Sequence, residues 1–214
     1  VTNVIIDLCV SRLPKAYGYT AFDNIQVLSP SKKGELGTAE LNSKLQNALN
    51  PKSDDKQEVT IGSKTFRTGD KVMQIKNNYD IRWFKDNGET GEGIFNGDIG
   101  IIEKIDKKTK IIKISFYDKT AAYTYESASD LDFAYAVTVH KSQGNEFDAV
   151  IIPMFQGPPQ LYYRNLLYTA VTRAKKTLIL VGNPHTVEYM VNNNRRTKRY
   201  SGLKEFLLRD DGLY

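Results

Sequence analysis

Apolar residues change their spacing twice along the chain, which divides it into three stretches. In the first stretch, residues 1–64, the run NIQVLSP (residues 24–30) ends at a proline and predicts a strand. Helical spacing of apolar residues follows and predicts a helix from Thr38 to Asn50, with Thr38 as its N-cap. The apolar positions of that helix are Leu41, Leu45, Ala48 and Leu49.

The second stretch, residues 65–130, consists of short runs rich in β-branched and aromatic residues. These runs are DKVMQIKNNY, IGIIEKID, KIIKISFY and AAYTYES, and turn sequences such as NGDIG and DKKT separate them. Four or five short antiparallel strands are predicted, which favours a small barrel or curled sheet. Residues 81–93, with three glycines, predict a mobile loop tip.

The third stretch, residues 131–214, returns to an α/β pattern. AYAVTV, DAVIIPM and TLILVGN are continuous apolar runs typical of buried strands, and LYYRNLLYTAVTRA has helical spacing. Asn183 and Pro184 fit the N-cap and first turn of a further helix through about Asn193. The predicted fold class is therefore α/β, one domain with a parallel sheet interrupted by a small β unit.

Composition adds limits rather than an identity. The chain is 40% hydrophobic and 26% charged, and its longest apolar runs, such as residues 178–181, are far shorter than the roughly 20 residues that span a bilayer. The chain starts Val-Thr-Asn without a signal peptide, which suggests a piece of a longer polypeptide. The single Cys9, in an apolar run, predicts a buried thiol and a reducing, cytoplasmic location.

The charge permits an anionic partner without requiring one. The formal net charge is +5 and the pI is near 9.1. The densest basic stretch is RRTKRYSGLK near the C-terminus, which fits a solvated terminal segment and a phosphate-contacting one equally well. Its cations are Arg195, Arg196, Lys198, Arg199 and Lys204.

A cluster of hydrogen-bonding residues, His140 to Gln143, follows the strand run AYAVTV directly. Loops at the carboxyl ends of parallel strands line ligand crevices, so this cluster is a candidate binding edge. Gly144 would let the main chain turn or approach a ligand closely. A surface turn with satisfied hydrogen bonds explains the same letters.

Arg173 lies near the end of the predicted helix that leads into TLILVGN. In that position its planar guanidinium can reach a neighbouring phosphate. The alternative is an arginine that complements the dipole at a helix C-terminus.

Two segments together carry a family resemblance. KSQGNEFDAVIIP and LLYTAVTRAKKTLILVGN resemble motifs V and VI of superfamily 1 helicases, in letters and in order. QVLSPSKKGELGTAELNSKLQ resembles the motif IV region of the RecD-like, 5′-to-3′ branch, and GDKVMQIKNNYD with IFNGDIGII resembles the SH3-like barrel inserted there. Related phage, conjugative and Pif-type helicases share parts of this pattern.

The resemblance implies a RecA-like domain formed by residues 1–64 and 131–214, with an SH3-like barrel at residues 65–130 inserted. In such helicases ATP lies between two RecA-like domains, and motif VI supplies an arginine finger to the γ-phosphate. Here that residue is Arg173, with Gly144 and Glu146 implied on the nucleotide side.

The resemblance also implies contacts with the phosphates of single-stranded DNA. Thr138 and His140 are the first candidates, and Lys141 and Ser142 are further ones. An oriented structural histidine is the alternative for His140. Gln143 is expected to brace the loop rather than to touch a ligand.

The barrel contains residues with two interpretations. Asn77, Asn78 and Tyr79 fit a contact with DNA near the root of the barrel, and they fit an ordinary turn. Trp83 and Phe84 could stack on bases or form a hydrophobic patch on a hairpin, so they are not counted as site residues.

The sequence departs from a complete motor, because it contains no G-x-x-x-x-G-K-[ST] loop and no acidic Walker B strand before the motif IV region. ATP and Mg²⁺ are therefore expected to be held mainly by an N-terminal motor domain of the same parent chain, and no metal ligands are predicted here. We expect the C-terminal part of an ATP-dependent DNA helicase that is inactive alone. The alternative is a non-catalytic nucleic-acid-binding module, or one that docks subunits of a nuclease complex.

Overall fold

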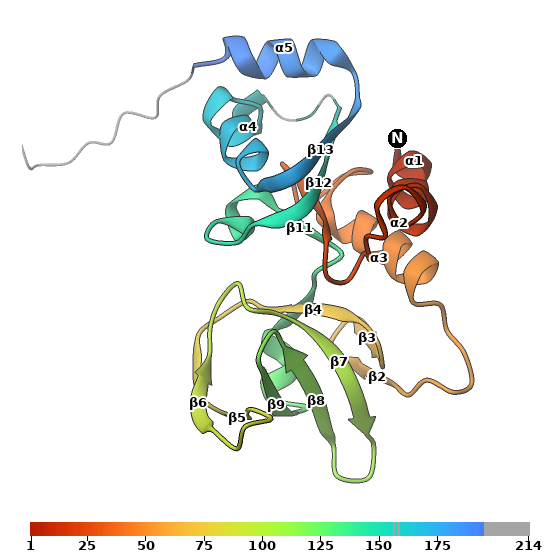
Figure 1. Cartoon of the computed structure of the whole chain (residues 1–214), viewed down its shortest axis with the longest axis vertical. Coiled ribbons are helices and arrows are strands. Elements are labelled where there is room, and N and C mark those ends of the chain that lie inside the picture. Colours follow the sequence, from red (N-terminus) through yellow and green to blue (C-terminus); the bar gives the residue numbers. More distant parts are fainter. Residues whose placement is uncertain (156, 158, 195–214) are drawn as a thin grey trace, which may run out of the picture.

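The computed structural model describes residues 1–155, 157 and 159–194, and the predicted basic stretch from Arg195 lies outside them. It contains a four-stranded parallel sheet in the order β11-β1-β12-β13 and a seven-stranded antiparallel sheet in the order β10-β4-β7-β8-β9-β5-β6. In Figure 1 the parallel sheet and its helices form the upper part of the molecule and the antiparallel sheet forms the lower part. The predicted α/β fold class with an inserted small barrel is confirmed.

The parallel sheet is built from β1 (Ile25–Ser29), β11 (Ala136–Thr138), β12 (Phe147–Met154) and β13 (Ala174–Gly182). Helices α1 (Thr2–Asp7), α2 (Leu13–Tyr17) and α3 (Thr38–Leu49) cover one face, and a π-helical turn (Leu8–Arg12) joins the first two. Helices α4 (Arg164–Val171) and α5 (Pro184–Asn192) lie on the other side. Each face has its own hydrophobic cluster, so β1 and β12 are buried on both sides, as apolar runs predict for parallel strands.

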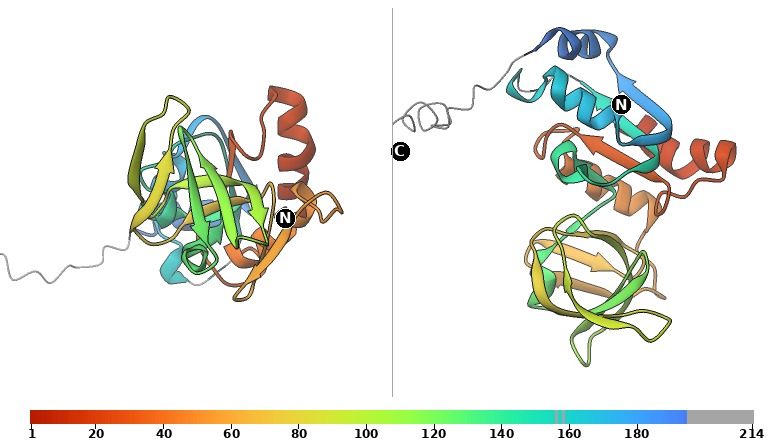
Figure 2. Two further views of the ribbon diagram at one scale, coloured as in Figure 1. Left: turned by 90° about the horizontal axis from the view of Figure 1, so that it is seen from below. Right: turned by 60° about the vertical axis from the view of Figure 1, so that its left-hand side comes forward.

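The antiparallel sheet curls into a small barrel (Figure 2). Its strands are β4 (Lys71–Gln74), β5 (Asn78–Phe84), β6 (Thr90–Ile94), β7 (Ile99–Asp106), β8 (Ile111–Phe116), β9 (Lys119–Thr124) and β10 (Leu131–Phe133). A separate hairpin, β2 (Glu58–Ile61) with β3 (Lys64–Arg67), leads into it. The barrel has its own core, in which Val72, Ile114 and Tyr123 are fully buried.

The buried carboxylate of Asp70 links the parallel-sheet part to the barrel through four hydrogen bonds. Its Oδ1 accepts hydrogen bonds from Asn50 Nδ2 (2.7 Å) and the Tyr135 hydroxyl (2.9 Å). Its Oδ2 accepts from Gln46 Nε2 (2.7 Å) and the Arg67 main-chain N–H (2.7 Å). Asp70 therefore ties α3, the β3 end and the approach to β11 together at the root of the barrel.

The predicted N-cap of α3 is wrong by one residue. The cap is Gly37, which has an extended conformation, and Thr38 is already helical. A Cβ at Gly37 would lie 2.6 Å from main-chain atoms of Lys32 and Lys33, so the turn that starts the helix accepts only glycine there. The predicted N-cap of α5 is confirmed, because the Asn183 side chain accepts from His185 N at 2.9 Å.

The predicted loop at residues 81–93 is too long, since β5 and β6 form a paired hairpin there and only residues 85–89 lie between the two strands. Gly91 faces the Trp83 indole so closely that a Cβ would lie 2.4 Å from a ring atom. Trp83 packs on the barrel core, with Lys85 Nζ and Lys119 Nζ each 5.5 Å from the ring centroid. The glycine here serves packing rather than mobility.

The prediction of a buried strand at TLILVGN is also wrong in its burial. β13 is the edge strand of the described sheet, and its residues are half-buried or exposed throughout. Leu178 and Leu180 are 37% and 39% exposed. An apolar run shows that a strand can be buried, but not that it is. Among the described residues, no further strand pairs with the outer edge of β13.

Candidate nucleotide and nucleic-acid site

The loop between β11 and β12 crosses the parallel sheet from one edge to the other. Ser29 of β1 is level with Thr138, while Val27 is level with Ile151, which places Thr138 level with Pro153 of β12. Phe147, the first residue of β12, lies six residues earlier, or about 20 Å along the strand direction. Thr138 therefore lies at the carboxyl edge, and Gly144 to Phe147 lie at the amino edge.

The carboxyl-edge part of the loop is a 3₁₀ turn, Val139–Ser142. Thr138 is half-buried and His140 is exposed, so both can meet a ligand from solvent. Ser142 is fully buried, and its hydroxyl donates to the Val139 carbonyl at 2.8 Å. Ser142 braces the turn in this structure and does not face solvent, whereas Gln143, expected to brace it, is exposed.

Lys141 lies in a basic environment that the sequence does not reveal. Partial burial lowers its pKa, Asp132 opposes this, and the charges of Lys32 and Lys64 lower the pKa further. Lys64 is held by the Leu131 carbonyl at 2.8 Å and by Asp132 at 3.1 Å. We call Lys32, Lys64 and Lys141 the lysine trio. Their charges act on one another from separate elements and Asp132 offsets part of them, so the trio is a candidate contact for an anion.

At the amino edge, Gly144 has φ +90° and open space where a Cβ would stand. An L-residue would be strained there, which explains the glycine. Glu146 is exposed, and its nearest cation is Lys175 Nζ at 4.0 Å. Its carboxylate is therefore free to accept hydrogen bonds from a ligand hydroxyl.

The half-buried guanidinium of Arg173 makes three hydrogen bonds. It donates to the Thr169 carbonyl (3.2 Å), the Asn145 carbonyl (3.1 Å) and the Thr172 hydroxyl (3.2 Å). The Arg173 main-chain oxygen in turn accepts from Phe147 N at 2.9 Å. All partners are neutral, so the positive charge of Arg173 remains available to an anion at this edge.

The predicted residues thus fall into two groups. Gly144, Glu146 and Arg173 come together at the amino edge, and Thr138, His140 and Lys141 follow the carboxyl end of β11. The residues missed from the sequence are Asn145, Lys32 and Lys64, whose positions depend on contacts between distant segments.

The exposed aromatics of the barrel are Tyr79, Phe84, Phe95 and Tyr117. Tyr79 and Phe95 pack edge to face, with ring centroids 5.8 Å apart, and Asn77 Oδ1 accepts from Asn96 N at 2.9 Å. Asn78 and Tyr79 belong to β5, so the alternative of a simple turn does not describe them.

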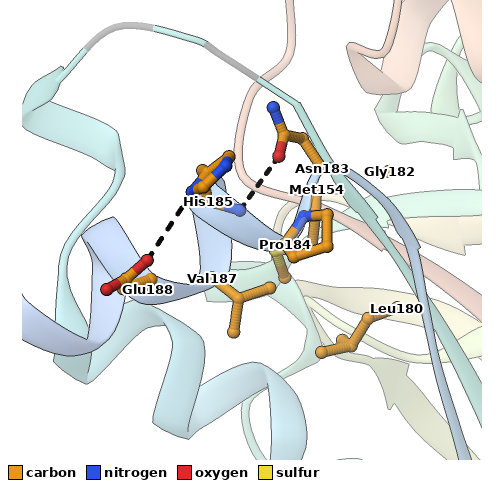
Figure 3. Close-up of a pocket in the computed structure, with 8 residues that line it drawn as sticks. All are labelled: Met154, Leu180, Gly182, Asn183, Pro184, His185, Val187 and Glu188. Atoms are coloured by element: carbon orange, nitrogen blue, oxygen red, sulfur yellow. Dashed lines mark hydrogen bonds and ion pairs between the residues drawn. The ribbon is translucent and has the colours of Figure 1, made fainter.

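A separate hollow lies where β13 leads into α5 (Figure 3). Met154, Leu180, Pro184 and Val187 make it mainly apolar, and His185 Nδ1 lies 3.6 Å from the Glu188 carboxylate at its rim. None of the predicted site residues lines it. The hollow does not resemble a site for a polyanion, because no Lys or Arg lines it and its one histidine lies beside a carboxylate.

The described residues contain neither a metal-ligand cluster nor a membrane-spanning helix. No group of three or more His, Cys, Asp or Glu side chains is placed to hold a metal ion there. No helix in that part of the chain is long and apolar enough to cross a membrane.

Two family models match the chain. Residues 41–116 match the SH3 domain of ATP-dependent RecD-like DNA helicases, and residues 133–181 match the UvrD-like helicase C-terminal domain. Together they cover most of the barrel and the segment that carries the loop and Arg173.

Curated relatives agree with these models. The chain is 34% identical over 187 residues to an uncharacterized protein of Methanocaldococcus jannaschii, covering 80% of this chain and 16% of that protein. It is 34% identical over 159 residues to the ATP-dependent RecD2 DNA helicase of Deinococcus radiodurans, covering 74% and 20%. RecBCD enzyme subunit RecD of Mycobacterium tuberculosis is 35% identical over 114 residues, covering 53% and 19%. The chain spans a fifth or less of the length of these relatives.

Solved structures share the fold. A Pif1 helicase from Bacteroides in complex with ADP-AlF3 and ssDNA superimposes with a TM-score of 0.50 at 15% identity, covering 99% of this chain and 50% of that one. Pif1 helicase from Candida albicans gives 0.50 at 15% identity, covering 97% and 54%. The RecA-like sheet and SH3-like barrel, the two family models and the RecD relatives together show that the chain belongs to the RecD-like family of superfamily 1 DNA helicases, as part of its C-terminal region.

Proposed function

We propose that this chain is the part of an ATP-dependent DNA helicase that supplies an arginine finger and part of the grip on single-stranded DNA. The observation that carries the proposal is the position of Arg173 beside the Gly144–Glu146 loop, with its cationic fork bound only to neutral groups. A guanidinium in this state can exchange those partners for phosphate oxygens, which bind it more strongly because they are charged.

ATP would meet this chain at the amino edge of the sheet. Arg173 would stabilise the charge that develops on the transferring phosphoryl group, and the Glu146 carboxylate would accept a ribose hydroxyl. The main chain at Gly144 would approach the nucleotide closely, since no side chain blocks it. Mg²⁺, which neutralises phosphate charge, would be held mainly by the N-terminal motor domain of the parent chain.

Single-stranded DNA would meet the chain at the carboxyl end of β11. Thr138 and His140 supply a hydroxyl and a ring N–H to phosphates, and Lys141 adds charge together with Lys32 and Lys64. Ser142 contributes through the turn that it braces rather than by direct contact. One loop then connects DNA phosphates to the nucleotide across about 20 Å of sheet, so closure on ATP would move the DNA grip.

ATP hydrolysis by the complete parent chain tests the proposal, with and without single-stranded DNA. We expect DNA to stimulate the wild type, and Arg173→Ala to keep DNA binding while losing roughly 10³-fold or more in turnover. A parent without DNA-stimulated hydrolysis would leave a nucleic-acid-binding module in its place.

The proposed polarity is 5′ to 3′ and has its own test. A duplex with a 5′ single-stranded tail should be opened in the presence of ATP, and one with only a 3′ tail should not. The reverse result would contradict the 5′-to-3′ direction, but it would still agree with an ATP-driven motor.

A second candidate function is a docking module within a nuclease complex. The observation in its favour is that several relatives are named as RecD subunits of the RecBCD enzyme. Tagged parent chain expressed in its own cells should then co-purify with other subunits in fixed proportion, and a monomeric preparation with full helicase activity would exclude this role.

A further inference from the structure

Asn145 joins the barrel to Arg173. Its side-chain Nδ2 donates to the main-chain oxygen of Gly97, at 3.4 Å, across 48 positions of sequence. Its main-chain oxygen accepts from Arg173 Nη1 at 3.1 Å, across 28 positions. One residue thus contacts the turn between β6 and β7 with its side chain and the arginine with its main chain.

The barrel side of this joint is held in place by its own hydrogen bonds. Gly97, at φ +102°, donates its N–H to the Gln74 carbonyl of β4 at 2.9 Å. Phe95 N donates to the Asp98 carboxylate at 3.0 Å, and Asp98 N donates to the Phe95 carbonyl at 3.0 Å. The Gly97 carbonyl therefore moves with the barrel as a unit.

Packing supports the same joint. Met73 of β4 is buried in the hydrophobic cluster that contains Phe147, and Ile99 of β7 packs against that cluster. Beside them lies a cavity of about 620 Å³ whose polar lining includes Asp98, Asn145 and Glu146. The barrel and the start of β12 are therefore packed together through apolar side chains on one side and separated by an open hollow on the other.

We propose that Asn145 is a positioning residue that transmits the position of the barrel to Arg173. The proposal rests on the proposed function, in which Arg173 must leave its resting partners to reach a triphosphate. A shift of the barrel pulls on the Asn145 side chain, displaces the adjacent main-chain oxygen and releases the guanidinium from it. A nucleic-acid strand that moves the barrel would thereby raise ATP turnover.

The variant Asn145→Ala in the complete parent chain isolates this link. Alanine keeps the main-chain oxygen that accepts from Arg173 and removes only the bond to Gly97. The matched control is Asn96→Ala, in the same barrel turn, whose exposed side chain makes no hydrogen bond to the described residues. Asn145→Gln restores an amide donor and serves as the conservative variant.

The measurement is kcat and KM for ATP, each with and without single-stranded DNA. For Asn145→Ala we expect the factor by which DNA raises kcat to fall at least about fivefold, as for a lost coupling of ordinary strength. The KM for ATP should be unchanged, Asn96→Ala should match the wild type, and Asn145→Gln should regain part of the stimulation. Hydrogen exchange of residues 95–98 should also quicken in Asn145→Ala at an unchanged melting temperature.

The outcomes separate this proposal from the proposed function. If Arg173→Ala abolishes turnover while Asn145→Ala keeps the wild-type stimulation factor and exchange rates, the joint is overturned and the arginine finger stands. If Arg173→Ala leaves turnover intact, the proposed function fails first. Should Asn145→Ala not fold, Asn145→Ser, too short to reach Gly97, provides the same comparison.

Discussion

Arg173 and Asn145 are bound to each other across the edge of the parallel sheet, with the guanidinium donating to the Asn145 carbonyl at 3.1 Å. Two residues on, Phe147 N donates to the Arg173 carbonyl at 2.9 Å. The arginine and the loop therefore hold each other at both ends, and a displacement of either displaces the other. Under the proposed function, a displacement of the loop by one ligand would therefore shift the guanidinium that meets the other ligand.

The geometry of the guanidinium, beyond its charge, should matter. Arg173→Lys keeps the charge and loses the planar fork that spans the Thr169 and Asn145 carbonyls. In the parent chain we expect kcat to fall roughly 10²-fold or more with little change in DNA affinity. Steady-state hydrolysis at saturating DNA measures this.

The control is Arg164→Lys, at the start of α4, whose side chain hydrogen-bonds only to the Val191 carbonyl among the described residues. This variant should keep wild-type turnover. If Arg173→Lys is also fully active, the site needs only a point charge and the arginine-finger role is lost.

The lysine trio should contribute to the salt dependence of DNA binding. Lys141→Gln removes one charge of the trio, and loss of one phosphate contact should reduce the slope of log affinity against log salt by about 0.7. Fluorescence anisotropy of a labelled single strand at several salt concentrations gives that slope.

Lys107→Gln is the matched control, since Lys107 is exposed in the turn between β7 and β8, at the far end of the barrel in Figure 1. It should leave the slope unchanged. Equal slopes for Lys141→Gln and the wild type would remove the trio from the DNA interface.

The sequence predicts the elements of this molecule better than their surroundings. Apolar runs are sufficient to place β1, β12 and β13, because the spacing of apolar residues along the chain is the main sequence signal for a strand. Whether β13 is covered depends on a neighbour, which no local pattern records. For the same reason, the motif makes Arg173 a candidate from the sequence alone, whereas the contact between Asn145 and Gly97 joins segments 48 residues apart and has no local signal.

Asp70 should be a main determinant of stability. Asp70→Ala removes the acceptor of four hydrogen bonds. Gln46 Nε2 and Asn50 Nδ2 each keep a second, main-chain carbonyl acceptor. The Arg67 N–H and the Tyr135 hydroxyl lose the acceptor that they have in this structure. Each fully unsatisfied buried donor costs about 1–3 kcal/mol, so we expect a loss of about 3 kcal/mol in the free energy of unfolding. Urea denaturation measures it.

Tyr135→Phe removes a single one of these hydrogen bonds and provides the scale. Its expected cost is about 1 kcal/mol, because the Asp70 carboxylate keeps three donors. If Asp70→Ala costs no more than Tyr135→Phe, the carboxylate does not hold the root of the barrel together.

Lys71 should make stability depend on pH in an unusual direction. Its ammonium is buried, donates to the Ala21 and Ile25 carbonyls at 3.0 and 3.2 Å, and burial lowers its pKa to about 8. In the unfolded chain the pKa is about 10.4, so between about pH 8 and 10 the unfolded state binds more protons and stability rises with pH. Over the full interval the gain is about 3 kcal/mol.

Lys71→Met serves as the comparison, since it fills similar space without a proton to lose. Both proteins should carry Cys9→Ala, because burial raises the pKa of the Cys9 thiol to about 12 and that group alone would lower stability above about pH 9. Urea unfolding at pH 7 and at pH 9.5 then isolates the lysine. We expect the Lys71 protein to gain stability relative to Lys71→Met at the higher pH, and a difference independent of pH would mean that Lys71 keeps an ordinary pKa in the fold.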